Sequence, residues 1–301
     1  MSNPIRGNQC AMVTPFNAEG AIDEASLEKL VEHLITAGVH GILAVGTTGE
    51  AFSLEVAERK YIAEKVVKLV ARRVQVGVMI GYVGTRPTIE LGRHAESIGA
   101  DYVLVPPPPS AFPLSGRGLA SYYTEVARAL QSPVMVYDGG GGAEVPLSVW
   151  PSIVEQAENI RYAKVSVQDP PRLRTLLDLL HGHVQPLAGK EETVLAMLGN
   201  GAVGMVSGVS NVLPADVSAM YVSYSAGKLE DARDVFYRKI NPIVTMTFAA
   251  RNEYIQCLKT CLCWMGVISV SATRHPLPPL DAVRVRELRG AIEFAGVPLR
   301  S

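Results

Sequence analysis

Lys164 is the residue whose type and setting point most directly to chemistry. It lies inside the apolar run IRYAKVSV, where a charged side chain is costly to bury. Burial disfavours the charged form of a lysine, and a neutral amine can attack the carbonyl carbon of a 2-oxo acid to form a Schiff base. The structural alternative is a strand-end lysine whose ammonium extends along its aliphatic stem into solvent.

Tyr137 ends another apolar run, 27 residues before Lys164. That separation fits one strand-helix-strand crossover, which would place both side chains at the same end of a parallel sheet. A phenol can donate and accept a proton, as imine formation and cleavage of C–C or C–O bonds require. The alternative for a lone strand-end tyrosine is packing.

Two more apolar runs end in polar turns. GILAV continues into Gly46-Thr47-Thr48-Gly49-Glu50, which offers two hydroxyls and backbone N–H groups as a cradle for a small carboxylate, although such a segment can also be a simple turn. Another run ends in Gly189-Lys190-Glu191-Glu192. Lys190 could bind a distal carboxylate or hydroxyl of a ligand, or it could pair with the two glutamates on the surface.

Eight short apolar runs alternate with amphipathic segments along the chain, a pattern typical of a parallel sheet with crossover helices. Because the runs are apolar on both faces, an α/β fold with a closed (β/α)8 TIM barrel is favoured over an open doubly wound sheet. In such a barrel the catalytic groups lie at the C-terminal ends of the strands. The strands are expected at Cys10–Thr14, Gly41–Val45, Val74–Ile80, Asp101–Val105, Val134–Tyr137, Ile160–Lys164, Val184–Ala188 and Val203–Ser207.

Apolar residues at three- and four-residue spacing predict the helices. Outer barrel helices are expected at Asp23–Ala37 and Leu54–Ala71. After the eighth strand, helices are expected at Leu213–Ala226, Leu229–Ala249 and Tyr254–Met265. The domain organisation that follows is a catalytic barrel over residues 1–225 and a helical C-terminal extension over residues 226–301, packed on the barrel.

Composition excludes several classes of protein. The 301 residues are 48% hydrophobic and 19% charged, which suits a large folded core and excludes disorder. Twenty-eight basic against 29 acidic residues, without a basic cluster, argue against a nucleic-acid partner. A polar N-terminus and the absence of a long apolar stretch predict a cytoplasmic protein without membrane association. Four cysteines and six scattered histidines form no evident metal-binding pattern.

These residues together resemble a known family. GILAVGTTGEAFSL, Tyr137, Lys164 and GKEETVLAMLGNGAVGMVSGVSN are similar to the dihydrodipicolinate synthase and N-acetylneuraminate lyase family of class I Schiff-base lyases. The resemblance runs from AMVTPF at residues 11–16 to RHPLPPL at residues 274–280. It implies a (β/α)8 barrel with a helical C-terminal extension, assembly as a homotetramer or homodimer, and no metal or organic cofactor.

The resemblance also implies roles for individual residues. Lys164 would be the Schiff-base lysine and Tyr137 the general acid and base. Thr47 would supply a relay hydroxyl, and Thr48 would hold the substrate carboxylate with its hydroxyl and backbone N–H. The other substrate-binding residues that the resemblance implies are Gly46, Gly189 and Val206.

Two loops depart from the pattern of dihydrodipicolinate synthases. Those enzymes usually carry Asn after the catalytic Tyr and an Arg a few residues on, whereas this chain has Asp138, Gly139 to Gly142, Ala143 and Glu144. Such an acidic loop is expected to repel the carboxylate of aspartate semialdehyde, unless the glycine run is only a flexible loop. The interface Tyr of those enzymes is also missing, because the loop after the fourth strand reads Pro106 to Pro109 and then SAFP.

The segments VPPPPSAFPLSGRG and KVSVQDPPRLRTLL look closer to branches that dehydrate or cleave 2-keto-3-deoxy sugar acids, such as 2-keto-3-deoxyarabonate dehydratase. The first hypothesis is therefore an enzyme that forms a Schiff base with pyruvate or a related 2-oxo acid and then performs aldol cleavage, condensation or dehydration. Dihydrodipicolinate synthase activity is one alternative. A barrel that binds a small molecule without turnover is the other.

Overall fold

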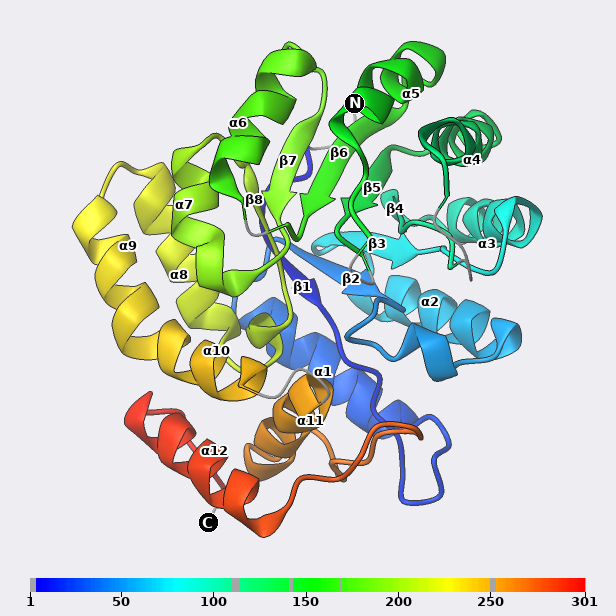
Figure 1. Ribbon diagram of the computed structural model, residues 1–301. Helices are drawn as coiled ribbons and strands as arrows, with labels where there is room; N and C mark the ends of the chain where they lie inside the picture. Colours follow the sequence, from blue (N-terminus) through cyan, green and yellow to red (C-terminus); the bar gives the residue numbers. More distant parts are fainter. Residues whose placement is uncertain (1–3, 110–113, 141–142, 168, 250–252, 301) are drawn as a thin grey trace.

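The computed structural model describes residues 4–109, 114–140, 143–167, 169–249 and 253–300. Its centre is a closed barrel of eight parallel strands, in which each strand pairs with the next and β8 pairs with β1 (Figure 1). The predicted (β/α)8 TIM barrel is therefore confirmed. The strands are β1 (Gly7–Ala11), β2 (Gly41–Ala44), β3 (Gln75–Met79), β4 (Tyr102–Val105), β5 (Val134–Asp138), β6 (Ile160–Val165), β7 (Gln185–Ala188) and β8 (Gly204–Ser207).

A ring of helices surrounds the strands (Figure 1). Capping residues begin two of these helices, because Asp23 accepts a hydrogen bond from the Ser26 backbone N–H and Glu55 forms a capping box with Glu58. The barrel helices are α1 (Glu24–Thr36), α2 (Val56–Val70), α3 (Thr85–Ser97), α4 (Gly116–Arg128), α5 (Trp150–Gln156), α6 (Pro170–Leu179), α7 (Val194–Gly199) and α8 (Pro214–Ser225).

The first strand begins three residues earlier than the sequence predicts. Asn8 and Gln9 interrupt its apolar pattern, yet both side chains are fully buried. Asn8 donates to the Ser218 hydroxyl at 3.0 Å, and Gln9 donates to the backbone carbonyl of Arg6 at 2.9 Å. Because hydrogen bonding satisfies both amides, the strand tolerates polar residues that a search for apolar runs excludes.

The C-terminal extension contains more elements than expected. The predicted single helix Leu229–Ala249 is divided into α9 (Leu229–Val235), a π-helical stretch η5 (Phe236–Ile240) and α10 (Asn241–Phe248). Pro242, at the start of α10, has no N–H to continue a regular helical ladder. α11 (Tyr254–Trp264) is close to prediction, whereas α12 (Ala282–Phe294) was not predicted. Its apolar stripe is thin, with only Leu288 and Ile292 buried in a charged helix.

The extension packs where the chemistry is expected. α10 contacts η3 (Glu191–Thr193) after β7, and α11 contacts η4 (Val209–Asn211) after β8. α12 lies against α10 and α11, as Figure 1 shows. The extension therefore reaches the C-terminal end of the barrel. The domain boundary predicted between residues 225 and 226 falls between α8 and α9. None of the helices formed by the described residues has the length and apolar character that a membrane span requires.

Candidate active site

Lys164 and Tyr137 meet at the C-terminal end of the barrel. They are partners in the parallel register of β5 and β6, and only 6% of Lys164 and 9% of Tyr137 is exposed. The Lys164 Nζ lies over the Tyr137 ring, 4.1 Å from its centroid. The prediction that the two side chains meet is confirmed, and the alternative in which Lys164 extends into solvent is wrong.

Tyr137 ionises more readily than an ordinary tyrosine. Burial alone raises the pKa of Tyr137, but the nearby Lys164 and hydrogen bonds with Ser166 and Lys164 bring that pKa below its ordinary value. Glu191 opposes this effect through its negative charge. A phenol with a lowered pKa, in contact with an amine, suits proton transfer at that amine.

Gly189 leaves the space that Lys164 needs. A Cβ at this position would lie 2.2 Å from the Ser166 Oγ and 3.0 Å from the Lys164 Cγ. Ser166 donates a hydrogen bond to the Gly189 carbonyl at 3.1 Å, which holds the ends of β6 and β7 together. Gly189 therefore lies beside the lysine, as expected of a lining residue. Val206 is buried on β8.

The turn after β2 is held in an unusual backbone conformation. Val45 has a φ of 56°, a region in which a β-branched residue is strained. Thr14 donates to the Gly49 carbonyl at 2.7 Å, and a Cβ on Gly49 would lie 3.0 Å from the Met12 carbonyl oxygen. The neighbouring strand-end loop therefore approaches this turn too closely for a larger residue at Gly49. Gly46 is buried at the start of the turn.

The two threonines of the turn differ in environment. Thr48 is buried and its side chain shares a hydrogen bond with the Tyr254 side chain from α11, whereas Thr47 is exposed. Tyr254 is not evident from the sequence as a site residue, because it is the first residue of a predicted helix and carries no motif. The structure thus brings Thr48 into a buried polar contact and leaves Thr47 at the surface of the turn.

The end of the same turn is anchored by the C-terminal extension. Glu50 is fully buried, forms an ion pair with Lys259 of α11 and accepts a hydrogen bond from the Arg274 backbone N–H at 2.9 Å. Separating the buried Glu50–Lys259 pair would leave an uncompensated buried charge on each side. The pair therefore holds the turn against the extension.

Glu191 corrects an expectation about the loop after β7. The sequence left open a surface pairing with Lys190, but Glu191 is buried and accepts hydrogen bonds from the Ser207 hydroxyl and from the backbone N–H groups of Gly208 and Val209, at 2.8 to 3.0 Å. Burial raises the pKa of Glu191, although these hydrogen bonds oppose the rise. Its carboxylate organises the loop after β8, while Lys190 is half-buried.

Asp138 corrects the expectation of an acidic loop after β5. It is 1% exposed, accepts a hydrogen bond from the Val145 backbone N–H at 2.8 Å, and forms an ion pair with Arg172 at 3.0 Å. Its charge is therefore compensated, and Glu144 is the exposed acidic group of this loop. Arg172 could have been found from KVSVQDPPRLRTLL, because Asp169 followed by two prolines marks a helix start beside the end of β6. Gly141 and Gly142 lie outside the described residues, as do the SAFP residues 110–113.

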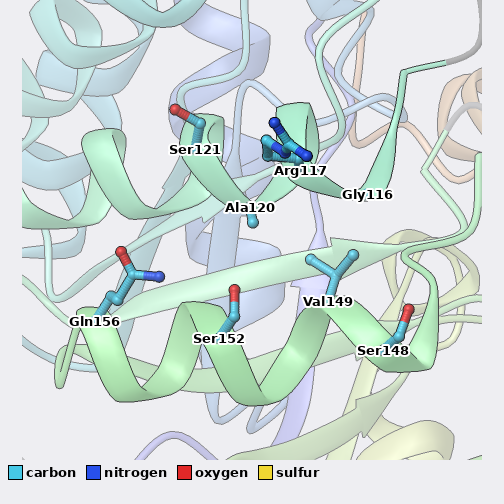
Figure 2. Close-up of a pocket in the computed structure, with 8 residues that line it drawn as sticks. All are labelled: Gly116, Arg117, Ala120, Ser121, Ser148, Val149, Ser152 and Gln156. Carbon is cyan, nitrogen blue, oxygen red and sulfur yellow. The ribbon is translucent and has the colours of Figure 1, made fainter.

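A separate pocket lies on the outside of the barrel, between α4 and α5 (Figure 2). It contains one charged side chain, Arg117, and none of the predicted site residues lines it. Its lining residues are Gly116, Arg117, Ala120, Ser121, Ser148, Val149, Ser152 and Gln156.

Among the described residues, no group of three or more His, Cys, Asp or Glu side chains is arranged to hold a metal ion. The four cysteines are free, with Cys10, Cys257 and Cys261 buried and Cys263 half-buried. Burial raises the pKa of Cys257 to about 11, so its thiol stays protonated near neutral pH.

Residues 4–295 match the model of the dihydrodipicolinate synthetase family. A 4-hydroxy-tetrahydrodipicolinate synthase of Thermodesulfovibrio yellowstonii is 32% identical over 97% of this chain and 99% of its own length.

Solved structures give the same result. The 4-hydroxy-tetrahydrodipicolinate synthase of Methylacidiphilum fumariolicum SolV superposes with a TM-score of 0.92 at 29% identity, covering 97% of this chain and 96% of that one. Dihydrodipicolinate synthase from Aquifex aeolicus has a TM-score of 0.93 at 27% identity, covering 99% and 100%.

Proposed function

Because this chain belongs to the dihydrodipicolinate synthetase family of class I Schiff-base lyases, we propose that it cleaves or dehydrates a 2-keto-3-deoxy sugar acid through a Schiff base on Lys164. The observation that carries the proposal is the buried contact between the Lys164 amine and the Tyr137 ring at the C-terminal end of the barrel. It supplies a nucleophile and a proton-transfer group together, as this chemistry requires.

In the proposed reaction, the Lys164 Nζ attacks the C2 carbonyl carbon of the 2-oxo acid, and the resulting carbinolamine loses water to give the imine. The imine accepts the electron pair that is released when a C–C bond breaks or when a proton leaves C3. Tyr137 moves protons at the carbinolamine and at the C4 hydroxyl, which loses its proton when the C3–C4 bond breaks or gains one and leaves as water in the dehydration. Hydrolysis of the imine then frees the product and Lys164. Thr48 holds the C1 carboxylate, Thr47 relays protons at the open side of the turn, and Gly46, Gly189 and Val206 line the pocket.

The loops after β4 and β5 support a sugar acid as substrate. Neither contains the interface Tyr or the loop Arg that the sequence pattern of dihydrodipicolinate synthases leads one to expect. A polyhydroxylated chain needs hydrogen-bonding groups rather than a second cation for its distal end.

A second candidate is 4-hydroxy-tetrahydrodipicolinate synthase. The names of the curated relatives favour it, and so does the pairing of Asp138 with Arg172, because the compensated Asp138 charge no longer opposes a second substrate carboxylate. Both candidates form a Schiff base on Lys164. The first forms it with the sugar acid itself, whereas the second forms it with pyruvate, which then condenses with aspartate semialdehyde.

A substrate panel separates the candidates. Purified protein is incubated with 2-keto-3-deoxy sugar acids, with pyruvate release and loss of water followed separately, and in parallel with pyruvate plus aspartate semialdehyde. We expect turnover of a sugar acid and little product from aspartate semialdehyde. Efficient condensation of aspartate semialdehyde, with no sugar acid consumed, would reject the sugar-acid proposal in favour of the second candidate.

A further inference from the structure

Tyr254 enters the candidate site from outside the barrel sequence. It is the first residue of α11, and its ring stacks on Phe248 of α10, with centroids 4.4 Å apart and planes at 22°. Its hydroxyl lies so close to the backbone after β8 that a Cβ built on Gly208 would be 1.6 Å from the oxygen. The same hydroxyl shares a hydrogen bond with Thr48. It therefore bridges the loops after β2 and β8.

The surroundings of Tyr254 are those of the site. Burial, followed by the charge of Glu191, raises the pKa of Tyr254 well above its ordinary value, and Cys10 and Tyr137 also act on it electrostatically. Tyr254 consequently keeps its proton across the neutral range, unlike Tyr137, whose pKa is lowered. It is a permanent hydroxyl donor rather than a second titrating acid.

The extension holds Tyr254 from behind. Arg284 of α12 forms an ion pair with Glu253, the residue before Tyr254, at 2.8 Å and donates to the Met246 carbonyl at 2.9 Å. α11 also contacts η4, the loop after β8. The position of the phenol is thus set by α10, α11 and α12. Thr48 lies in a different part of the fold, in the turn after β2.

We propose that Tyr254 is a positioning residue that directs the Thr48 hydroxyl toward the C1 carboxylate of the 2-oxo acid. A threonine hydroxyl has one proton to donate. When the Tyr254 phenol donates to the Thr48 Oγ1, the Thr48 hydroxyl proton is left for the carboxylate. Because the Thr48 hydroxyl then accepts one hydrogen bond, it becomes a stronger donor in the other. The inference rests on the proposed Schiff-base function and assigns the extension a part in substrate recognition.

The test compares Tyr254→Phe with the wild type in borohydride trapping at graded concentrations of pyruvate and of methyl pyruvate, which lacks the carboxylate charge. We expect the half-saturating pyruvate concentration to rise about tenfold, the loss that follows when a hydrogen bond to a charged group is weakened. The maximal adduct should stay the same, and the half-saturating methyl pyruvate concentration should change less than about twofold. Tyr221→Phe is the matched control, because Tyr221 donates to the Val203 carbonyl before β8, at the opposite end of the barrel.

Two further variants keep the inference testable if Tyr254→Phe folds poorly. Gly208→Ala retains every polar group of the site but occupies the space of the Tyr254 hydroxyl. It should therefore raise the half-saturating concentration of pyruvate more than that of methyl pyruvate, as Tyr254→Phe does. In a Thr48→Val background, Tyr254→Phe should add no further loss.

Equal losses for pyruvate and methyl pyruvate would overturn the inference, since they would mean a general structural role. An unchanged pyruvate response in a folded Tyr254→Phe variant would overturn it as well, while leaving the Schiff-base function intact. Failure of the wild type to form an adduct with any 2-oxo acid would refute the proposed function, and this inference with it.

Discussion

Lys164 and Tyr137 occupy paired positions on neighbouring strands, and this pairing explains their mutual influence. Parallel register places residues at the same height, so two strand-end side chains on β5 and β6 point to one mouth. Burial removes the water that would otherwise screen their interaction, and the pKa of Tyr137 falls because its phenolate would lie beside Lys164. The lowered pKa of Tyr137 therefore depends on the presence of Lys164.

At the residue scale, Tyr137→Phe is expected to keep the fold and to lower turnover about 100-fold or more, the usual contribution of a positioned proton-transfer group. Since the pKa of Tyr137 is lowered, its phenol loses the proton at a lower pH than an ordinary tyrosine. The wild-type kcat/KM should therefore decline on the alkaline side below about pH 10, the ordinary tyrosine pKa. The measurement is kcat/KM against pH for both proteins with Tyr221→Phe as control, and near-wild-type activity of Tyr137→Phe would remove it from the mechanism.

Residues that end apolar strands can be predicted from the sequence, because a polar group there contrasts with its neighbours. Lys164, Tyr137 and the turn from Gly46 to Glu50 are evident on this basis. Tyr254 could not be identified in this way, because its place depends on how α11 packs against the barrel. The helix start that carries Arg172 is visible in the sequence, but its pairing with Asp138 depends on how α6 packs. Such contacts between distant elements leave no local pattern, so the charge balance around Asp138 could not be read from its own loop.

At the element scale, the C-terminal extension is a support of the candidate site. Strand and outer-helix periods are strong signals, so the barrel could be predicted to within a few residues, whereas α12 buries too little apolar surface to show a period. The contacts that matter run from the extension to the loops after β2 and β8. Lys259 holds Glu50, and Arg274 binds Glu58 of α2 with two nitrogens, at 2.6 and 2.7 Å.

Arg274→Ala is therefore expected to lower the free energy of unfolding by about 2 kcal/mol at pH 7, the range for hydrogen bonds to charged groups. Arg274→Lys should not restore it, because lysine cannot form the bidentate contact. Hydrogen bonding to Arg274 lowers the pKa of Glu58, so this stabilisation is present above the ordinary glutamate pKa and is lost as the pH falls through the folded pKa. Urea unfolding at pH 7 and below pH 4 checks both points.

The control for that prediction is Arg86→Ala, which removes an exposed pair with Glu90 on α3 and should leave stability unchanged. An Arg274→Ala effect that is equally large at both pH values would contradict the assignment to Glu58.

At the scale of the whole molecule, three exposed apolar residues lie in segments that follow neighbouring strands of the barrel. Phe52 (55% exposed), Val83 (68%) and Leu114 (40%) follow β2, β3 and β4, which are neighbours in the barrel. Large apolar side chains exposed together mark an interaction surface. This surface is the one we expect to bury in a homo-oligomer.

Light scattering is expected to report about four protomers of 32.3 kDa, and Val83→Arg should reduce that mass while keeping the fold. The Val83→Arg substitution should have this effect because a guanidinium buried without a partner in the interface opposes association. A monomer across micromolar concentrations of the wild type would contradict the expected assembly.

The Schiff base on Lys164 is tested most directly by trapping it with pyruvate and borohydride and mapping the modified residue by mass spectrometry. A stable adduct is expected on the peptide that contains Lys164, with none on Lys190. No adduct is expected in Lys164→Ala, and none in Lys164→Arg, because a guanidinium keeps its proton and cannot attack the carbonyl. An adduct on another lysine of the folded protein, or none with any 2-oxo acid, would contradict the assignment to Lys164.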